Sequence, residues 1–241
     1  MILKADLHVH TTASDGRTDI AGLVREAKRR GLDAIAVCDH NMCTPLPDLQ
    51  TDGIMLIPST EISTKAGHVL GLFVKDIDFK KLRENGLPEA ADAVKHIHAC
   101  GGLAVLAHPF EYKNARPENF DCADFDFIET ANSRAPMKIK NANELARRYA
   151  NDRSLPQTGG SDAHGADELA GSYTEIECSG VDELKAALRA GKTRAVFVRR
   201  CRWIQKGKTR LNLARKKPSI KKSVKAVIYF AYTVFREIFG F

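Results

Sequence analysis

The sequence lacks the features that mark disulfide-bonded, secreted or membrane-spanning chains. Its six cysteines include no Cys-x-x-Cys pair, and no stretch has the pattern of a signal peptide. The apolar run near the C-terminus, residues 226–235, holds ten uncharged residues, whereas a bilayer-spanning helix needs roughly 20. These absences argue against a disulfide framework and predict a reducing, cytoplasmic compartment. The cysteines are Cys38, Cys43, Cys100, Cys122, Cys178 and Cys201.

Acidic residues are nearly missing from the C-terminal segment. Residues 199–241 carry 13 Lys/Arg and a single acid, Glu237, whereas residues 1–198 carry 24 Lys/Arg and 29 Asp/Glu. The net charge of +7 therefore comes from an acidic body with a basic tail. We expect two parts, residues 1–198 and residues 199–241, and the charge of the second part suggests an anionic partner.

Short apolar stretches alternate with amphipathic ones along the first 198 residues. The predicted strands cover residues 2–7, 34–38, 54–58, 69–74, 103–107, 125–130, 155–159 and 174–177. The predicted helices cover residues 20–30, 88–100, 137–150 and 181–190. This alternation is typical of parallel strands joined by crossover helices. At least six such units in one chain favour a (β/α) barrel over an open sheet.

Histidines and acids recur where the predicted strands begin or end. The first strand delivers His8 and His10, and because side chains alternate along a strand, both imidazoles point to the same side. Barrels of this class place their chemistry at the carboxyl ends of the strands, so we expect these side chains to converge. The candidate metal ligands are His8, His10, Asp15, His40, Glu61, His68, His108, Asp162 and His164.

The kind and number of these ligands predict the metal. Imidazoles and carboxylates favour Zn, Mn or Fe(II) over Mg or Ca, which prefer shells made of oxygen alone. Nine ligands exceed the need of one ion, so we expect two or three divalent ions that share a bridging carboxylate. His96 and His98 lie within a predicted helix and are left out of the set.

Seven short motifs resemble the PHP domain (polymerase and histidinol phosphatase) in the same order over residues 1 to about 198. The resemblance implies a distorted seven-stranded TIM-like barrel, (β/α)7, with a trinuclear metal site. It is greatest for small stand-alone metal-dependent phosphoesterases. The motifs are D-L-H-V-H-T (6–11), D-H-N (39–41), E-I-S (61–63), G-H-V-L-G-L (67–72), H-P (108–109), N-S-R (132–134) and S-D-A-H (161–164).

The same resemblance implies how the ligands are shared among three ions. The first ion would take His8, His10, Glu61 and Asp162. The second would take the bridging Glu61 with His68 and His108. The third would take Asp15, His40 and His164. The chain departs from the family in having Cys38 where Thr is usual, and it lacks the long insertion that some nucleotidases carry, so the exact substrate stays open.

The expected activity is hydrolysis of a phosphate ester, either a phosphomonoester or a nucleotide-type substrate. Clustered divalent ions lower the pKa of a bound water toward neutrality and neutralise charge on phosphoryl oxygens. We expect Arg134, just past a strand, to hold a phosphate oxygen. The catalytic set is Arg134, Asp162 and His10, with His10 or a metal-bound water as the acid.

Residues beside the ligands have expected supporting roles. Asp6 and Asp39 each adjoin a candidate ligand, and we expect them to orient imidazole rings. Asn132 could assist the phosphate contact or bond its own turn.

Two other functions share parts of this pattern. A catalytically silent, metal-stabilised scaffold with a binding tail would have no need of nine convergent ligands. An amidohydrolase-type enzyme acting on C–N bonds shares the barrel and the ions. It would be expected to use a carboxylated lysine at a strand end, and no lysine stands at one here.

The tail combines a basic run, residues 199–225, with an aromatic-rich helix. The rings Tyr229, Phe230, Tyr232, Phe235 and Phe239 suggest an interfacial helix on an anionic membrane surface. Binding along a nucleic-acid backbone ranks behind this. The alternative is that the helix packs on the barrel exterior and the basic run is a solvated linker. The oligomeric state is left open.

Overall fold

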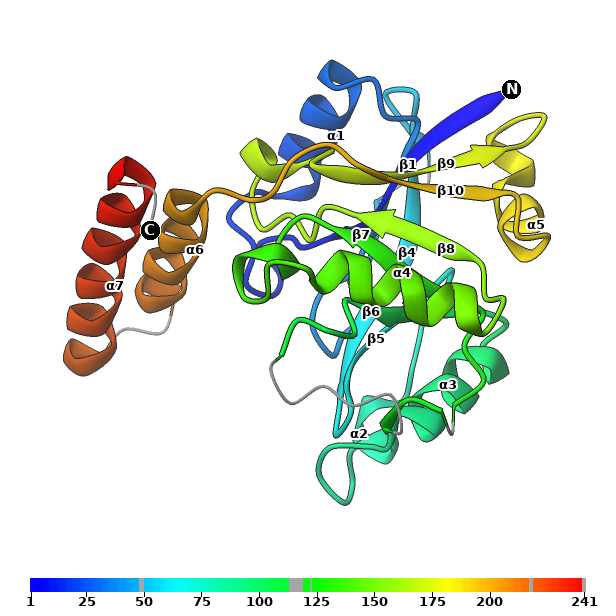
Figure 1. The fold of residues 1–241 in the computed structure, drawn as a ribbon, viewed down its shortest axis with the longest axis horizontal. Helices are drawn as coiled ribbons and strands as arrows, with labels where there is room; N and C mark the ends of the chain where they lie inside the picture. The colour runs from blue at the N-terminus through cyan, green and yellow to red at the C-terminus, as the bar shows by residue number, and fades with distance from the viewer. Residues whose placement is uncertain (48–49, 113–118, 122, 217–218, 240–241) are drawn as a thin grey trace.

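The computed structural model of the chain describes residues 1–47, 50–112, 119–121, 123–216 and 219–239, so Cys122 lies outside the described residues. Within them, strands form one twisted sheet in the order β10-β9-β1-β2-β4-β5-β6-β7-β8, and β3 pairs with β4 (Figure 1). The strands are β1 (Ile2–Val9), β2 (Ala34–Val37), β3 (Gln50–Thr51), β4 (Ile54–Thr64), β5 (Gly67–Leu72), β6 (Leu103–Ala107), β7 (Phe127–Asn132), β8 (Gln157–Gly160), β9 (Ser172–Glu177) and β10 (Thr193–Phe197).

The sheet path has nine strands in the described part of the chain, so the predicted count of seven is wrong. The two strands β9 and β10 form an antiparallel extension beside β1. Strand β5 also runs antiparallel to both of its neighbours, β4 and β6. Only Lys65 and Ala66 connect β4 to β5, which is far too short for the crossover that a parallel pair requires.

The sheet curls into a nearly closed barrel where the segment after β8 meets β1. The His10 amide donates to the Ala163 carbonyl at 2.8 Å, and the Ala163 amide donates to the His8 carbonyl at 3.3 Å. Gly160 permits this approach, because a Cβ there would lie 2.4 Å from the His8 Cβ. This seam brings residues 161–164 against the end of β1.

Helices cover the outside of the barrel and bury apolar faces against it. In α1, Leu23, Val24 and Ala27 belong to a buried cluster with Ile35 and Leu56 of the sheet. The helices of residues 1–198 are α1 (Ile20–Arg29), α2 (Phe79–Leu82), α3 (Ala90–Ala99), α4 (Ala142–Asp152) and α5 (Leu184–Arg189), with 3₁₀ turns at Ala135–Met137, Ala166–Glu168 and Val181–Glu183. The packed barrel forms a rigid support for its mouth.

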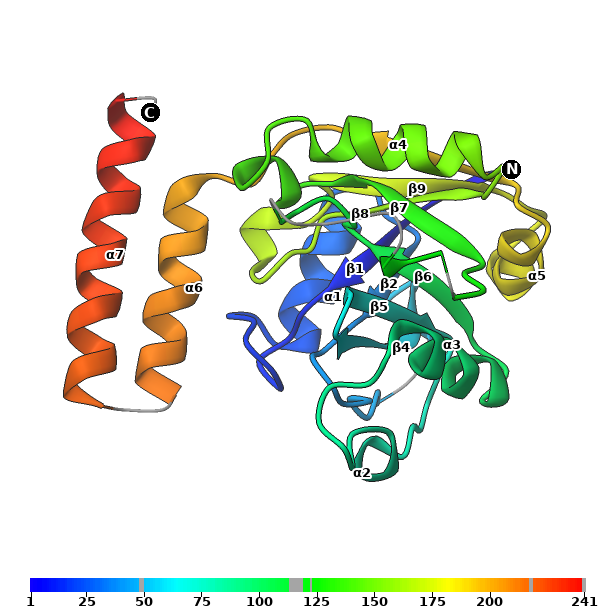
Figure 2. The ribbon, with the colours of Figure 1, turned by 60° about the horizontal axis from the view of Figure 1, so that its bottom comes forward.

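The C-terminal segment is a helical hairpin, so the alternative in which its basic run is a solvated linker is wrong. Helix α6 (Trp203–Lys216) lies beside α7 (Ile220–Phe239) in both views (Figures 1 and 2). Gly207 allows the close contact, because a Cβ there would lie 2.2 Å from Thr233 Oγ1. The Glu237 carboxylate, near the end of α7, binds the start of α6 by accepting from Arg202 Nε at 2.6 Å and from the Trp203 amide at 2.9 Å.

The hairpin docks on the barrel through α6. Asn212 Nδ2 donates to the Gly16 carbonyl at 3.1 Å, and Gln205 Nε2 donates to the Asp167 carbonyl at 2.9 Å. The Lys216 ammonium donates to three carbonyls of the segment that we call loop 12–16, at 2.7, 3.1 and 3.3 Å. Among the described helices, none combines the length and apolar character needed to cross a bilayer.

Candidate metal centre

The strand ends and loops around the barrel mouth bring all nine predicted ligands together. His8 lies in β1 and His10 follows it, while His40 and His108 follow β2 and β6. Glu61 lies inside β4 rather than after it, because β4 continues to Thr64 and the predicted strand 54–58 was too short. His68 lies in β5, Asp162 and His164 follow β8, and Asp15 lies on loop 12–16.

Glu61 is the central carboxylate of the cluster. Its Oε2 lies 3.0 Å from His40 Nδ1, 3.3 Å from His10 Nε2 and 3.5 Å from His8 Nε2. Its Oε1 lies 2.6 Å from His68 Nδ1 and 3.2 Å from His108 Nε2. One side chain thus contacts five imidazoles, a geometry suited to a carboxylate that bridges cations.

Two aspartates surround the other end of the cluster. Asp15 Oδ2 lies 3.0 Å from His164 Nε2 and 3.6 Å from His40 Nε2. Asp162 Oδ1 lies 3.4 Å from His10 Nε2 and 3.4 Å from His164 Nδ1. Within the described chain, three groups offer ligand atoms that all lie within 4.8 Å of one another: His10, Asp15, His40 and His164; His8, His10 and Asp162; and His8, Glu61 and His108.

Several buried nitrogens of the cluster form no well-aligned hydrogen bond among the described residues, although carboxylate oxygens lie 2.6 to 3.7 Å from them. They are His8 Nε2, His10 Nδ1, His10 Nε2 and His68 Nδ1. A buried polar atom without a partner is costly and rare in folded proteins. A divalent cation would supply the missing partner, and imidazole with carboxylate is the donor set that Zn, Mn and Fe(II) accept. The residues therefore fit a metal centre.

The carboxylates of the cluster shift the pKa values of neighbouring histidines. Burial alone would lower the pKa of His40 and of His108, but the neighbouring carboxylates outweigh it and raise both pKa values to about 9. Burial, with His164 and His40 nearby, lowers the pKa of His10 to about 4. The surrounding imidazoles outweigh burial at Glu61 and hold its pKa well below the usual range. A metal ion would take the place of the protons that these rings attract.

Two of the nine residues have unusual backbone conformations. His108 has a φ of 28° and Asp162 has a φ of 54°, values that residues other than glycine seldom adopt. The Glu129 carboxylate fixes the first by accepting from the His108 amide at 3.0 Å. Strained backbone of this kind persists where the surrounding structure holds it, and it concentrates at functional sites.

Two glutamates that contact the imidazole rings of candidate ligands were missed by the sequence analysis. Glu129 Oε1 lies 3.1 Å from His8 Nδ1, and Glu111 Oε2 lies 3.3 Å from His108 Nδ1. Carboxylates in such positions fix the orientation of imidazole ligands. Lys138 Nζ in turn lies 2.6 Å from Glu111 Oε1. The available signal was Glu129 itself, an acid within an otherwise uncharged strand.

Asp6 and Asp39 do not orient imidazoles, so that expectation is wrong. The Asp6 carboxylate accepts from the amides of Ser161 and Ala170 at 2.8 and 2.9 Å. Asp39 accepts from Thr11 Oγ1 at 2.6 Å. Both aspartates hold the loops that carry the ligands, because their short side chains reach neighbouring amides and hydroxyls.

Arg134 is buried beside the cluster and paired with Glu168. Its Nε and Nη2 atoms donate to Glu168 Oε2 at 3.0 and 2.7 Å, and Nη2 also donates to Thr209 Oγ1 of α6 at 3.3 Å. Its charge helps to hold the pKa of Asp162 low. Asn132 bonds its own turn, because its Oδ1 accepts from the Arg134 amide at 2.8 Å.

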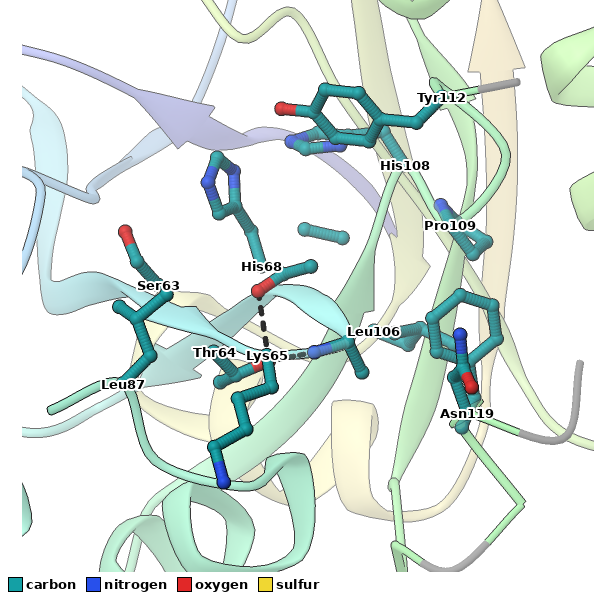
Figure 3. A pocket seen from close by; sticks show the side chains of 14 residues that line it. Ser63, Thr64, Lys65, His68, Leu87, Leu106, His108, Pro109, Tyr112 and Asn119 are labelled. Carbon is teal, nitrogen blue, oxygen red and sulfur yellow. Dashed lines mark hydrogen bonds between the residues drawn. The ribbon is translucent and has the colours of Figure 1, made fainter. Parts of the chain in front are cut away.

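Two pockets flank the cluster. Figure 3 shows the first, a space of about 330 Å³ whose lining includes His68, His108, Tyr112 and Lys65. The second, of about 750 Å³, lies between loop 12–16 and the hairpin, and Asp15 and His40 belong to its lining. A bound molecule could therefore extend from the cluster in two directions.

Two stretches of the chain match known protein families. Residues 6–105 match the PHP domain, and residues 140–193 match the family described as PHP-associated. An uncharacterized protein of Methanocaldococcus jannaschii is 30% identical over 182 residues, which cover 72% of this chain and 70% of the relative. The 5′-3′ exoribonuclease of Haemophilus influenzae is 24% identical over an alignment of 252 residues, which covers 68% of this chain and 91% of the relative.

Solved structures share the fold at lower identity. A two-domain protein from Bacteroides vulgatus, described as containing a predicted PHP-like metal-dependent phosphoesterase, aligns with a TM-score of 0.57, 24% identity and 82% of this chain covered. The lesion-specific endonuclease EndoQ from Pyrococcus furiosus aligns with a TM-score of 0.60, 18% identity and 81% of this chain covered. This chain spans only 65% and 58% of those two proteins. By its sequence matches and its fold, the chain belongs to the PHP domain family.

Proposed function

We propose that this protein hydrolyses phosphate esters with divalent metal ions held at the barrel mouth. The observation that carries the proposal is the convergence of five imidazole rings on the buried Glu61 carboxylate. The proposed ligands are the nine predicted residues, and the proposed metals are Zn, Mn or Fe. Ions bound there would lower the pKa of a water molecule toward neutrality and neutralise charge on the phosphoryl oxygens.

We propose two or three ions, and three groups of ligand atoms are available to hold them. The group of Asp15, His40 and His164 agrees with the ligand set expected for the third ion, with His10 added. The group around Glu61 and His108 differs from expectation, because it contains His8 and not His68. His68 still lies 2.6 Å from Glu61, so it stays in the proposed set.

The protein's own side chains would divide the remaining work. We assign Arg134 the role of holding a phosphoryl oxygen, because a guanidinium matches a phosphoryl group and the charge of Arg134 acts on Asp162. Asp162 would bind a cation through a carboxylate that stays ionised. His10, with a pKa of about 4, is neutral near pH 7 and is better suited to bind a cation than to act as the general acid.

The substrate class proposed is a phosphomonoester or a nucleotide-type molecule. The names of two similar proteins, an exoribonuclease and a lesion-specific endonuclease, favour the nucleotide-type alternative. We assign the phosphoesterase unit to residues 1–198 and an accessory role to residues 199–241.

The test is metal analysis of the purified protein, followed by assays under Mn, Zn and Fe(II). The substrate panel holds phosphomonoesters, nucleotides, short oligonucleotides and a matched set of amides. We expect two or three ions per chain and turnover of phosphate esters alone. Turnover of amides would support the C–N hydrolase, and bound metal without any turnover would support the silent scaffold.

A second candidate function, attachment to an anionic membrane surface, concerns the outer face of α7. Its exposed large apolar residues are Ile220, Val224, Val227, Ile228, Tyr232, Phe235, Ile238 and Phe239. The rings of Tyr229 and Phe230 are half-buried, so three of the five predicted rings are exposed. A helix with one apolar face and basic flanks can lie in a membrane interface. We propose such peripheral attachment as an addition to catalysis.

Pelleting with anionic vesicles tests this second candidate. We expect the full-length protein to bind at low salt and to be released as salt rises. Phe235→Ser with Phe239→Ser should abolish pelleting. Equal pelleting of the variant and the unchanged protein would contradict the proposal.

A further inference from the structure

The pocket between loop 12–16 and the hairpin is one continuous site with the metal cluster. Asp15 and His40 line it, and both belong to a group whose ligand atoms lie within 4.8 Å of one another. The pocket has a volume of about 750 Å³, enough for more than a single phosphate group.

The hairpin side of this pocket is strongly basic. It contributes Arg210, Lys216, Lys222 and Lys225, whereas Asp15 is the one acid in the described lining. Charges of one sign along a pocket raise the local concentration of ligands of the opposite sign. The pocket therefore favours an anion that lies next to the metal cluster.

One of the four cations is already committed to the fold. The Lys216 ammonium donates to the carbonyls of Thr12, Ser14 and Gly16, so its three N–H groups are used to position loop 12–16. It is a positioning residue. The other three, Arg210, Lys222 and Lys225, are exposed at the pocket, and none forms an ion pair with an acid in the described part of the chain.

The packing of the hairpin places these three cations on the pocket side. Lys222 and Lys225 are three residues apart and lie one above the other on α7. Buried Ala214 and Ala226 line the pocket where the two helices meet, so short side chains form its floor. The Arg210 guanidinium lies 5.0 Å from the centre of the Tyr229 ring, which gives it a preferred position.

We propose that this pocket binds a second phosphate of the substrate, next to the one that is hydrolysed. The inference rests on the proposed function, because it takes the scissile phosphate to lie at the metal cluster. A substrate held there and extending over Asp15 and His40 reaches the cations of the hairpin. The preferred substrate class is then a 5′-phosphorylated short oligonucleotide, and an ester with a single phosphate makes none of these contacts.

The position of the lysines favours this ligand over a lipid surface. Lys222 and Lys225 line the pocket above the cluster, whereas the exposed apolar residues of α7 belong to its outer face. A membrane bound to the apolar face would leave these two lysines directed at the barrel mouth. Their charge is accordingly available to a soluble phosphate.

Binding of a hydrolysis-resistant phosphorothioate tetranucleotide with a 5′-phosphate tests the proposal without requiring turnover. The variant is Lys222→Ala with Lys225→Ala in the full-length protein as purified. The matched control is Arg215→Ala with Lys221→Ala, which removes two exposed charges of the hairpin that lie outside the pocket lining. In fluorescence anisotropy we expect Kd to rise about tenfold in the variant and less than about twofold in the control.

Salt dependence and kinetics sharpen the test. Loss of the contacts with this one phosphate should reduce the slope of log Kd against log salt by about 0.7. On the 5′-phosphorylated, hydrolysable tetranucleotide, kcat/KM should fall about tenfold in the variant, whereas kcat/KM on p-nitrophenyl phosphate should not change.

Three results would overturn the proposal: equal Kd values for variant and control, an equal loss on p-nitrophenyl phosphate, or an effect limited to anionic vesicles. An unchanged protein that binds the tetranucleotide but hydrolyses no ester would instead refute the proposed function and leave the binding result standing.

Discussion

The barrel mouth and the C-terminal hairpin differ in how far their charged side chains are exposed to solvent. At the mouth, nine ionisable side chains are packed so closely that each contacts another, and most are buried. On the hairpin, cations and large apolar side chains are exposed to solvent. Fixed, buried polar groups in a site of low dielectric suit chemistry, because they need little reorganisation. Exposed cations on helices suit recognition of a partner that can vary.

The two regions should therefore respond differently to substitution. At the mouth, loss of one group leaves a buried partner without compensation, and the cost is large. On the hairpin, loss of one charge is partly screened by salt, and the cost is small.

Glu61→Ala should have the largest effect. Glu61 contacts five imidazoles, so its removal should disassemble the metal centre and reduce phosphate-ester turnover by more than about 100-fold. Metal content should fall while circular dichroism stays unchanged, and Asp162→Ala should behave similarly. Glu89→Ala, at an exposed ion pair with Lys65, is the control. Near-normal turnover with a full metal content would refute the ligand assignment.

Arg134→Ala should have the second-largest effect. The change leaves the buried Glu168 without one partner, at a cost of about 3 kcal/mol in the free energy of unfolding. It should also lower kcat/KM on phosphate esters about 100-fold with the metal content intact. Glu168→Gln separates the two roles, because it removes the ion pair and keeps the guanidinium. Equal losses of kcat/KM in both variants would show that Arg134 acts only on the structure.

Glu129→Gln should weaken metal binding by about 10- to 100-fold. The amide keeps the size of the side chain but no longer supplies a negative charge beside His8 Nδ1. Metal titration monitored by calorimetry measures the change, with Glu144→Gln on the exposed face of α4 as control. An unchanged affinity would show that the orientation of His8 does not depend on this carboxylate.

After the metal ions are removed with a chelator, the free energy of unfolding should fall as pH rises from about 6.5 to 9. Nearby carboxylates raise the pKa values of His40 and His108 to about 9, above the ordinary value of 6.5, so protonation of these rings stabilises the fold. This contribution is fully present below 6.5 and is lost as pH passes through 9. We expect the free energy of unfolding to fall by about 2 kcal/mol. Each kcal/mol corresponds to roughly 2–4 °C in Tm. The metal-loaded protein should not show this fall, and a Tm that rises with pH in the chelated protein would contradict the interpretation.

Lys216→Met should have the smallest effect. It removes the ammonium that holds three carbonyls of loop 12–16, so Asp15 becomes less well positioned. We expect metal affinity to fall by less than about tenfold. Lys221→Met, an exposed change on α7, should leave the affinity unchanged. Equal affinities for the two variants would mean that the hairpin does not support the metal centre.

Much of the barrel was predictable because its signals are local. The apolar strands that carry His8, His108 and Asp162 lie within a residue or two of where the sequence indicates them. Spacing along a strand fixes which side chains share a face, so the convergence of the nine residues could be inferred. The α/β class and the barrel-like arrangement follow from the alternation of elements.

The rest depends on contacts between distant segments. The antiparallel β5 and the added β9 and β10 arise from pairing geometry that apolar runs alone do not encode. The role of Glu129 depends on its distance from His8, which lies 121 residues away in the chain. Helix α6 was missed because its residues are mostly polar, and its buried face is set by contacts with the barrel, such as that of Thr209 with Arg134.

The seam at Gly160 has a consequence for how the protein folds and opens. His8 and His10 lie on one side of the seam and Asp162 and His164 on the other, so a shared cation would link the two ends of the barrel. Such a link closes a loop of about 150 residues and, like a disulfide, would limit the conformations of the unfolded chain. Contacts between such distant segments form late in folding. Amides of residues 160–164 should accordingly be the first in the barrel to exchange with solvent after the metal is removed.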